Sequence, residues 1–462
     1  MLSDSLHGTI NRKELLKKAG AGAAAAAASG TLLSQAGAAH AAAAPPPTPV
    51  VSNLGKGTKT ITIWDGLGGA DGAIFAKMLA LFVRKNPDVK IHHETLDWGV
   101  YYQKVPTSIL AGSPPDFIVN DAYGLPQFAA RNMLQPLDAL IFGQNLLPKN
   151  DFSAGELAVG SWQNKVYGIP LWNPIIGFWM NTDLVRKAGL NPDKPPMTGP
   201  DFTEWAIRLT TDSHGRHPDQ AGFDSRNIQN YGVSMGWYFH SEISNLWQSG
   251  GDITNAAHTK CLLDQPESVA SLQYWTDLAT KYHTHVPISN IYVPATGPLY
   301  ASNRLAMVVE GSWWLNNFKT VFKSLNYPVT RLYPLPQWGS KQKAVWWTAH
   351  VMSIPAGISD QNTQVVARLI AFLSDQASWG SLESGHIPAR TSHKKLPAIN
   401  SNWWTGVLSR EQRNFGRLEW YSPNYNQQQT YYMAAWGAAL TGTSSPKAAL
   451  QQATQLINRT LG

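Results

Sequence analysis

The chain has 462 residues, a length that suits two or three domains of ordinary size. Hydrophobic residues make up 43% of the sequence and charged residues 15%, which excludes disordered and fibrous proteins. The formal net charge is +7, but 37 basic residues against 30 acidic ones form no long basic run, so no nucleic acid partner is expected. The 19 Trp and 16 Tyr residues stand out, because exposed aromatic rings need something to pack against.

The first 41 residues are predicted to be an export signal. Basic residues including Arg12 and Lys13 precede an Ala-rich run, and A-x-A sites such as Ala39-His40-Ala41 follow it. The Arg-Lys pair resembles a twin-arginine signal whose second Arg is Lys, which leaves both the Tat and the Sec route open. No later stretch has 18 consecutive apolar residues, so we expect an exported protein without a membrane-spanning helix.

The single cysteine, Cys261, excludes an intrachain disulfide. It lies far from the predicted cleavage site, so no lipid-anchor Cys is expected there. Its KCLLD context predicts a short strand in which Cys261 is a small buried hydrophobic residue. We therefore expect the protein in the periplasm or at the outer face of the cell membrane, held there by other means.

Strands and helices are predicted to alternate after a Pro- and Gly-rich tether at residues 42–57. Such alternation is typical of parallel strands covered by helices. The predicted strands are 60–64, 89–94, 116–119, 175–180, 305–309 and 351–355. The predicted helices are 73–85, 101–111, 183–188, 201–209, 267–282, 295–303 and 362–373.

Several short segments occur in an order typical of one protein family. They are TITIWDGLGGADG, AGSPPDFIVNDAY, KVYGIPL, LYASNRLAMVVEGSWW and SGHIPART, at residues 60–72, 111–123, 165–171, 299–314 and 384–391. Each segment is weakly specific by itself, but their occurrence in this order is strongly specific. The chain resembles, over about residues 58–460, the extracellular solute-binding proteins of bacterial ABC transporters, in their family-1, maltose-binding-protein-like, sugar-binding group.

The resemblance implies an α/β fold of the two-lobed, type II periplasmic-binding-protein kind, with the lobes joined by a hinge of about three crossings. Lobe one would comprise residues 58–175 and 351–390, and lobe two residues 176–350 and 391–462. The implied function is capture of a carbohydrate in the cleft between the lobes and its delivery to the permease subunits of an ABC transporter. The abundance of Trp favours an oligosaccharide. A monomer without a cofactor is expected.

A sugar site needs flat rings that stack on C–H faces and planar polar groups that pair with hydroxyls. Trp64 and Asp65 end the first predicted strand, before a glycine loop, although Trp64 could instead be core. Asp121 and Tyr123 follow the strand at 116–119 and resemble a loop that lines the cleft, although Asp121 could instead cap a helix. The last candidates of lobe one, Trp172 and Asn173, precede the first crossing, where relatives carry an acidic or polar group.

Lobe two and the second crossing supply the remaining candidates. Trp237 and Tyr238 resemble an aromatic wall, with Gly251 and Asp252 as a turn beneath it. Glu310 and Trp313 belong to an EGSW segment in which relatives carry a Trp that stacks on the sugar. Trp347 and His350 precede the second crossing; because neighbouring residues of a strand point to opposite faces, one of Trp346 and Trp347 is expected to be core.

Three other interpretations stay open. The family architecture also binds glycerol-phosphate diesters, although the candidate residues are poor in Arg and Lys. A secreted glycoside hydrolase could use Asp121 and Glu310 as its carboxyl pair. Histidines of the segment DSHGRHPDQAGFD could hold a metal, but a polar surface loop is favoured because no third ligand is fixed by the spacing. No motif of a hydrolase, NTPase or redox enzyme occurs, so no catalytic residue or metal ligand is expected.

Overall fold

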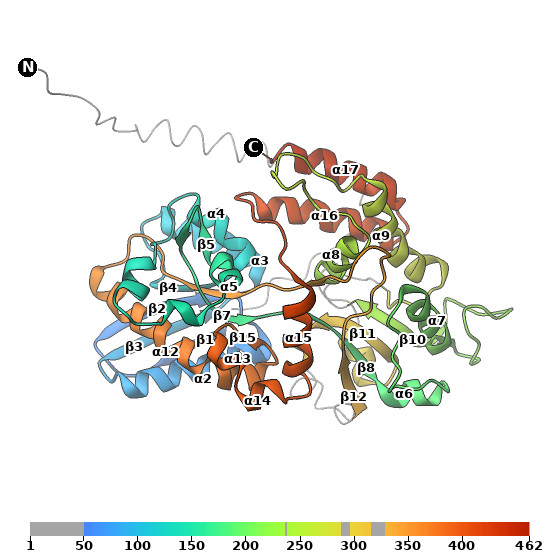
Figure 1. Ribbon diagram of the computed structural model, residues 1–462, viewed down its shortest axis with the longest axis horizontal. Helices are drawn as coiled ribbons and strands as arrows, with labels where there is room; N and C mark the ends of the chain where they lie inside the picture. Colours follow the sequence, from blue (N-terminus) through green and yellow to red (C-terminus); the bar gives the residue numbers. More distant parts are fainter. Residues whose placement is uncertain (1–49, 236–237, 288–295, 316–328, 462) are drawn as a thin grey trace, which may run out of the picture. The chain divides into compact units, whose positions relative to one another are not determined.

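The computed structural model describes residues 50–235, 238–287, 296–315 and 329–461 (Figure 1). The predicted export signal and Trp237 lie outside the described residues, as does the side chain of Tyr238. No helix in the described ranges combines the length and the apolar character that crossing a membrane requires.

Seven strands form the first sheet, in the order β1-β3-β2-β4-β14-β7-β15. They are β1 (Val50–Leu54), β2 (Lys59–Asp65), β3 (Val89–Thr95), β4 (Phe117–Asp121), β7 (Ile169–Asn173), β14 (His350–Ser353) and β15 (Ile387–Pro388). Only β3, β2 and β4 run parallel, and the remaining pairs are antiparallel. The expectation of parallel strands is confirmed for β2, β3 and β4, which follow one another with covering helices between them. It does not extend to the pairs that involve β14, β7 and β15, which are antiparallel.

The first strand corrects the tether prediction. Residues 50–54 pair antiparallel with β3, from Val50 opposite Thr95 to Leu54 opposite Ile91. The Pro and Gly content of the flanking residues hid two β-branched residues that suit an edge strand. The glycine at 57 is needed for close approach rather than for flexibility, because a Cβ there would lie 2.1 Å from the backbone of Asp88.

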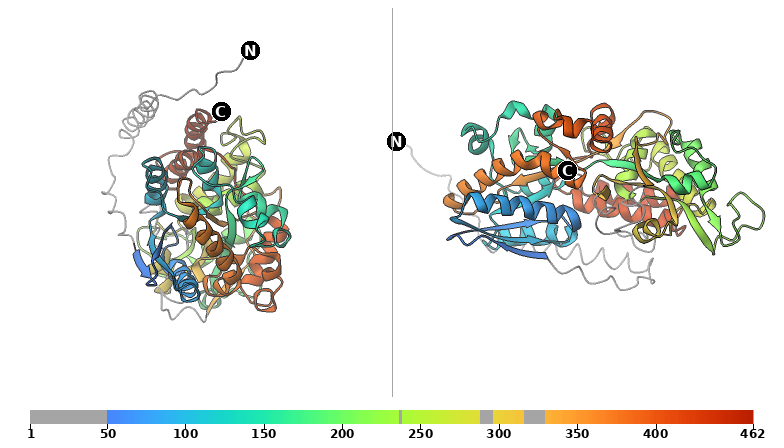
Figure 2. Two further views of the ribbon diagram at one scale, coloured as in Figure 1. Left: turned by 90° about the vertical axis from the view of Figure 1, so that its left-hand side faces the viewer. Right: turned by 90° about the horizontal axis from the view of Figure 1, so that it is seen from below.

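Helices cover both faces of the first sheet. On one face, α2 (Gly69–Lys85) and α12 (Asp360–Ser384) pack side by side although they are far apart in sequence (Figure 2). Their apolar side chains, with those of β2 and β4, form a core that includes Phe75 and Val366. On the other face lie α3 (Trp98–Leu110) and α4 (Leu125–Ala129). Helix α12 is longer than predicted and ends at Gly385, whose φ of +90° is left-handed.

Five strands form the second sheet, in the order β12-β8-β11-β10-β9, and only β10 and β11 run parallel. They are β8 (Ile176–Asn181), β9 (Thr211–Asp212), β10 (Ile228–Met235), β11 (Leu305–Gly311) and β12 (Thr330–Tyr333). The helices of this half are α6 (Thr182–Lys187), α7 (Gly199–Leu209), α8 (Tyr238–Gln248), α9 (Pro266–Thr276) with the π-helix η4 (Asp277–Lys281), α10 (Thr296–Ala301), α15 (Thr405–Phe415), α16 (Tyr425–Leu440) and α17 (Pro446–Asn458). Cys261 is buried, as expected, but the predicted strand is reduced to one bridge with Thr254.

Short elements complete the chain. They are η1 (Ala122–Gly124), η2 (Asp138–Gly143), η3 (Lys149–Asp151), α5 (Ala154–Val159), β5 (Ser161–Trp162), β6 (Lys165–Val166), β13 (Val345–Trp346), α13 (Thr391–Lys394), α14 (Pro397–Asn400) and β16 (Gly416–Arg417). Strands β13 and β16 pair with each other in parallel.

Two connections between the sheets run side by side. Residues 174–175 lead from β7 to β8, and residues 347–349 lead from β13 back to β14. Ile175 and Trp347 form an antiparallel bridge, and the Thr348 amide donates to the Pro174 carbonyl at 3.0 Å. The chain leaves the first sheet again after β15, through α13 and α14 to α15. The strands of each sheet lie within the residue ranges predicted for one lobe, except for β1 and for His350 at the start of β14, and the lobe boundaries themselves stay a prediction.

Candidate functional site

Aromatic and carboxyl side chains from both lobes meet in one buried group, which we call the interlobe cluster. Its members lie at or near the ends of strands or at the starts of helices: Asp121, Tyr123, His240, Trp313, Trp346, His350, His386, Glu419 and Tyr425. Four of them, Asp121, Tyr123, Trp313 and His350, were candidates from the sequence.

The lobe-one half of the interlobe cluster follows from strand pairing. Asp121 is the last residue of β4 and lies opposite His350, the first residue of β14. This register puts His350 Nε2 3.4 Å from Asp121 Oδ1. The turn η1 begins directly after Asp121 and carries Tyr123, whose hydroxyl donates to Asp121 Oδ2 at 2.6 Å. The end of β4 therefore presents a carboxyl group with a tyrosine and a histidine on either side.

Trp313 reaches the interlobe cluster because a glycine precedes it. A Cβ at Gly311, the last residue of β11, would lie 2.1 Å from the Trp313 ring, so the indole folds back over the strand end. Its ring centroid lies 6.2 Å from that of His240, on α8, and 6.5 Å from that of Trp346. His240 and Trp346 are closer still, with centroids 3.7 Å apart.

Two tyrosine–carboxyl pairs face each other across the interlobe cluster. Tyr425, at the start of α16, donates to Glu419 Oε2 at 2.6 Å, just as Tyr123 donates to Asp121. The two tyrosine rings stack with their centroids 4.6 Å apart and 29° between their planes. Trp346 Nε1 donates to the other oxygen of Glu419 at 3.1 Å. The pairs are matched in chemistry although they come from opposite ends of the chain.

Burial controls the ionisation of the interlobe cluster. Desolvation raises the pKa of Asp121 to about 7, against the hydrogen bond from Tyr123 and the nearby His386, which lower it. Desolvation likewise raises the pKa of Glu419 to about 8, against the hydrogen bonds from Tyr425 and Trp346. The pKa values of His240 and His350 are held well below the ordinary value by burial. Burial therefore favours the neutral forms of Asp121, Glu419, His240 and His350.

Hydrogen bonds beside Tyr425 link the two lobes at the surface. Arg131, after α4, donates through Nη1 to the Pro423 carbonyl at 3.0 Å. Asn426 on α16 donates through Nδ2 to Gln127 Oε1 at 3.1 Å. These bonds flank the stacked tyrosines, so the segment 423–426 and the end of α4 hold the lobes together at this point.

Asp65 and Trp64 end β2, as expected from the sequence, and both are bonded or packed within the protein. Asp65 is fully buried and its Oδ2 lies 2.6 Å from His93 Nε2, while its Oδ1 accepts the Leu67 amide at 3.1 Å. These bonds fix β2 to β3 and to the glycine loop, and a ligand role for Asp65 stays a prediction. The Trp64 ring is covered by the Lys104 ammonium group, 4.0 Å from its centroid. The glycine at 66 provides room for a protein side chain, because a Cβ there would lie 2.2 Å from the Trp98 ring.

Trp172 and Asn173 are buried at the end of β7. The Trp172 ring is fully buried against α12, and its Nε1 donates to the Ala377 carbonyl at 3.0 Å. Asn173 is also fully buried, and its Nδ2 donates to Glu156 at 2.6 Å. Glu156 in turn binds Lys394. All residues of β7 are buried, and a ligand role for Trp172 and Asn173 stays a prediction.

The predicted turn at Gly251 and Asp252 packs against and bonds to neighbouring protein groups. A Cβ at Gly251 would lie 2.5 Å from Leu246, which explains the glycine by close packing. The Asp252 carboxylate accepts from Arg417 at 2.5 Å and from Trp247 Nε1 at 3.2 Å. These contacts attach the turn to β16, and a ligand role for Gly251 and Asp252 stays a prediction.

Glu310 and Trp347 lie next to members of the interlobe cluster along the chain. Glu310 is 2% exposed, and its Oε1 accepts the Gly311 amide at 3.0 Å. Trp347 is 8% exposed and belongs to the paired crossings. Of the neighbouring tryptophans, Trp346 joins the cluster and Trp347 lies in the paired crossings, and a ligand role for Trp347 stays a prediction. A ligand role for Glu310 stays a prediction.

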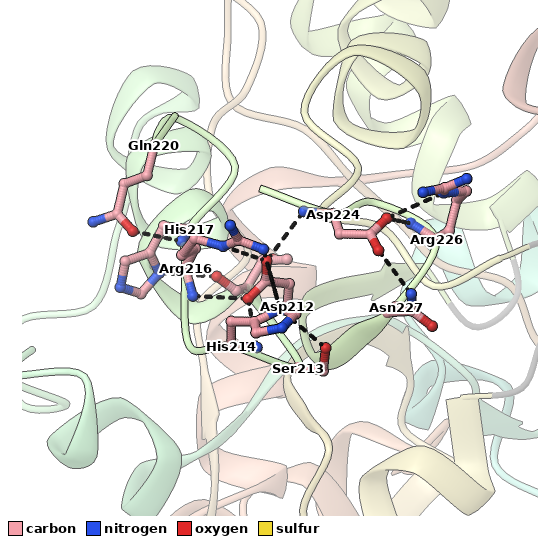
Figure 3. Close-up of polar contacts among 10 residues, drawn as sticks. Asp212, Ser213, His214, Arg216, His217, Gln220, Asp224, Arg226 and Asn227 are labelled. Atoms are coloured by element: carbon pink, nitrogen blue, oxygen red, sulfur yellow. Dashed lines mark hydrogen bonds and ion pairs between the residues drawn. The ribbon is translucent and has the colours of Figure 1, made fainter. Parts of the chain in front are cut away.

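The histidine-containing segment of lobe two is a loop organised by Asp212 (Figure 3). One oxygen of Asp212 accepts the amides of His214 and Arg216, and the other accepts Arg216 Nε and the Asp224 amide, at 2.8 to 3.1 Å. Burial alone would raise the pKa of Asp212, but these hydrogen bonds outweigh it and hold the pKa well below its usual range. The loop interpretation accounts for the polar residues here, and no set of three metal-ligating side chains occurs in the part of the chain that the structure describes.

Sequence reasoning missed several members of the interlobe cluster. Glu419 and Tyr425 lie in the segment EWYSPNY, where one acid and three aromatic rings fall within seven residues. This local density of aromatic and acidic residues could have marked the segment as a candidate site. His386 lies in the quoted segment SGHIPART but was not singled out as a site residue. His240 gave no signal, because a single histidine at the start of a helix is uninformative.

The comparisons with known proteins agree with the two-lobed arrangement. The model of the bacterial extracellular solute-binding protein family matches residues 67–377, so the chain belongs to that family. A solved ABC substrate-binding protein of Listeria monocytogenes, in complex with cycloalternan, superposes with a TM-score of 0.75 at 21% identity, over 87% of this chain and 99% of the other. The fold is accordingly the two-lobed type II periplasmic-binding-protein fold.

Two curated relatives match the chain at low sequence identity. A putative binding protein of Brucella abortus is 21% identical over 56% of this chain, and the match spans only 60% of the length of that relative. The sn-glycerol-3-phosphate-binding periplasmic protein of Agrobacterium fabrum is 24% identical over 73% of this chain and 76% of its own length. Identities this low place the chain in the family without assigning its ligand.

Proposed function

We propose that this solute-binding protein captures a carbohydrate, of oligosaccharide size, between its two lobes and delivers it to the permease of an ABC transporter. It acts outside the cytoplasm after export, as a monomer, without a cofactor and without chemical change to the sugar. The observation that carries the proposal is the interlobe cluster, in which aromatic rings and carboxyl groups from both lobes meet.

The chemistry of the interlobe cluster suits a sugar. Trp313, Trp346 and the two stacked tyrosines offer flat faces for the C–H groups of pyranose rings. The carboxyl groups of Asp121 and Glu419 are planar acceptors for hydroxyl groups. Such a combination of apolar walls and a few placed polar groups is typical of small-molecule sites.

The placement of these groups suits capture by closure. A ligand moves an open–closed equilibrium only by its difference in affinity for the two states. Rings that belong to different lobes contact the same ligand only when the lobes approach, so they supply that difference. The paired crossings at residues 174–175 and 347–349 are where such a rotation would occur.

A glycerol-phosphate ligand is the second candidate, favoured by the relative from Agrobacterium fabrum. A phosphate site uses Arg, Lys or the amides of a helix N-terminus. In the described part of the chain, the carboxyl groups of the interlobe cluster have tyrosine, tryptophan and histidine partners and no Arg or Lys partner. This composition favours a sugar over a phosphodiester.

The test measures tryptophan fluorescence and thermal shift of the mature chain against mono- and oligosaccharides and glycerol-phosphate compounds, with chromatography of the sugar afterwards. We expect saturable binding of an unchanged oligosaccharide, and at least a tenfold loss of affinity in Trp313→Ala. The matched control is Trp403→Ala, because Trp403 is 37% exposed and its ring packs only against Trp404 among the ring contacts of the described residues. Cleavage of the sugar would replace the proposal by a hydrolase, and a response to phosphodiesters alone would replace it by the second candidate.

A further inference from the structure

Three donors of the interlobe cluster are already engaged within the cluster. Its strongest donors, the hydroxyls of Tyr123 and Tyr425 and the indole of Trp346, are already bonded to Asp121 and Glu419. Each carboxyl oxygen has two lone pairs, so both groups still accept further bonds. A neutral hydroxyl needs donors as well as acceptors, whereas an ammonium group only donates.

A third acceptor lies beside Asp121. His350 is 6% exposed, and its Nδ1 is buried without a hydrogen-bond partner among the described residues. Its Nε2 faces Asp121 Oδ1 at 3.4 Å. With the proton on Nε2, the nitrogen Nδ1 is an acceptor, and a buried acceptor without a partner costs free energy that a donating ligand would recover. His350 Nδ1, which has no partner among the described residues, therefore belongs to a ring that lies next to the Asp121 carboxyl group.

Neither carboxyl group of the interlobe cluster is bonded to a Lys or Arg side chain among the described residues. Asp121 has Tyr123 and His350 as partners, and Glu419 has Tyr425 and Trp346. The two carboxyl groups sense each other, since an ionised Asp121 adds to the raised pKa of Glu419. Buried carboxylates are normally paired with a cation, and a carboxyl group that has none stays protonated. The missing cation can come from the ligand.

Building on the proposed carbohydrate function, we infer that the interlobe cluster selects an amino-bearing carbohydrate, whose ammonium group binds between the carboxyl groups of Asp121 and Glu419. The aromatic walls support this choice, because the faces of tyrosine and tryptophan rings attract cations as well as C–H groups. The ammonium group donates to both carboxylates and to His350 Nδ1, and the sugar ring packs on Trp313 and Trp346. Binding ionises carboxyl groups that are protonated in the free protein, so protons leave the site.

The test compares matched amino and neutral sugars on the mature protein by titration calorimetry. The pairs are glucosamine with glucose, galactosamine with galactose, and the β-1,4-linked glucosamine trimer with its N-acetylated counterpart. We expect the amino member of at least one pair to bind roughly tenfold or more tightly, the size of a charged hydrogen bond. Titration at pH 6 in two buffers of different ionisation enthalpy should show proton release with the amino sugar and none with the neutral one.

Substitutions connect the preference to the two carboxyl groups. Asp121→Asn and Glu419→Gln keep the shape of the side chains, and each should remove roughly tenfold or more of the preference for the amino sugar. The matched control is Glu204→Gln, because the Glu204 side chain is 65% exposed and pairs only with Arg208 among the ion pairs of the described residues.

The outcomes separate this inference from the function on which it rests. Equal or tighter binding of the neutral members overturns the inference and leaves the carbohydrate function intact. A preference for amino sugars that survives both substitutions, or that releases no protons, also overturns it, and the proton measurement needs no variant to fold. If neither the amino sugars nor the neutral sugars bind, the inference and the carbohydrate function are overturned together.

Discussion

Ser312 Oγ lies 2.7 Å from His386 Nδ1, and both side chains are fully buried. Ser312 follows β11 of the second sheet, whereas His386 precedes β15 of the first. On its other side, His386 Nε2 lies 3.0 Å from Asp71 Oδ2 at the start of α2. The ring of His386 therefore bonds to the Asp71 carboxylate through Nε2 and to the Ser312 hydroxyl through Nδ1. A three-membered chain of hydrogen bonds therefore joins the two lobes near the hinge.

Removing this link should destabilise the fold. Ser312→Ala leaves His386 Nδ1 buried without its hydrogen-bond partner, which costs about 1–3 kcal/mol of unfolding free energy. Denaturant unfolding followed by circular dichroism measures the change. Ser302→Ala is the control, because the Ser302 hydroxyl is exposed and bonds only to backbone carbonyls of its own helix. Equal stability of the two variants would show that the link contributes nothing.

The raised pKa values of the interlobe cluster predict a pH dependence of stability. The folded protein binds protons at Asp121 and Glu419 up to about pH 7 and 8, whereas the unfolded chain loses them near pH 4. Stability from these groups is fully present below pH 4 and is lost as the pH rises to about 8. We expect the Tm of the ligand-free protein to fall over this interval, and to fall less in the double variant Asp121→Asn, Glu419→Gln. Parallel curves for the two proteins would contradict the assignment.

Substitutions of Trp172 and Trp313 should have different effects on the free energy of unfolding and on ligand affinity. Trp172 is enclosed between β7 and α12, so Trp172→Ala should lower the unfolding free energy by about 3–5 kcal/mol. The partly exposed Trp313 should affect ligand affinity more than stability. Unfolding in guanidinium chloride, run beside the binding titration for each variant, gives both quantities. A variant of Trp172 with native stability would contradict this structural role.

The glycine before Ser312 should be required for the position of the Trp313 ring. Gly311→Ala places a methyl group 2.1 Å from the indole, which must move, at a cost of about 1–3 kcal/mol. We expect a changed near-ultraviolet circular dichroism spectrum and weaker ligand binding. Gly68→Ala is the control, because the nearest atom to a Cβ there is 4.0 Å away. Unchanged binding in Gly311→Ala would mean that the ring position does not matter.

The surface bonds beside Tyr425 should favour the closed arrangement. Arg131→Ala removes the bond to the Pro423 carbonyl, and we expect a larger radius of gyration in small-angle X-ray scattering without ligand. Arg226→Ala is the control, since the Arg226 side chain is 88% exposed and bonds only within its own loop. If both variants scatter like the parent protein, the contact does not bias the lobes.

The sequence predicted the alternation of strands and helices well, because hydrophobic periodicity is a local property. Strand β2, helix α2 and strand β11 lie within a few residues of their predicted positions. The pairing direction of β14 was not accessible, because it depends on a return from the other lobe. The same limit applies to β1, whose partner β3 lies more than a helix away.

The candidate site was predicted where a strand ends and its next residues face the cleft. Asp121 and Tyr123 follow this rule, and so does Trp313 after β11. At the end of β7 the rule points to Trp172 and Asn173, which are buried in this structure, because the elements that cover a strand cannot be read from that strand alone. Glu419 lies between β16 and α16, outside regular structure, and Tyr425 is the first residue of α16, so hydrophobic periodicity marked neither of them.

The edge strand β1 gives the chain a fixed point of attachment. Its five residues are hydrogen-bonded along β3, so a pull transmitted through the residues ahead of Val50 is taken up by the first sheet. The second sheet is connected to the first through the crossings and is not attached to β1. An attachment ahead of Val50, such as a bead or a tag, would therefore fix the first lobe and leave the second lobe free to move. We expect an attached protein to bind its ligand as well as a free one.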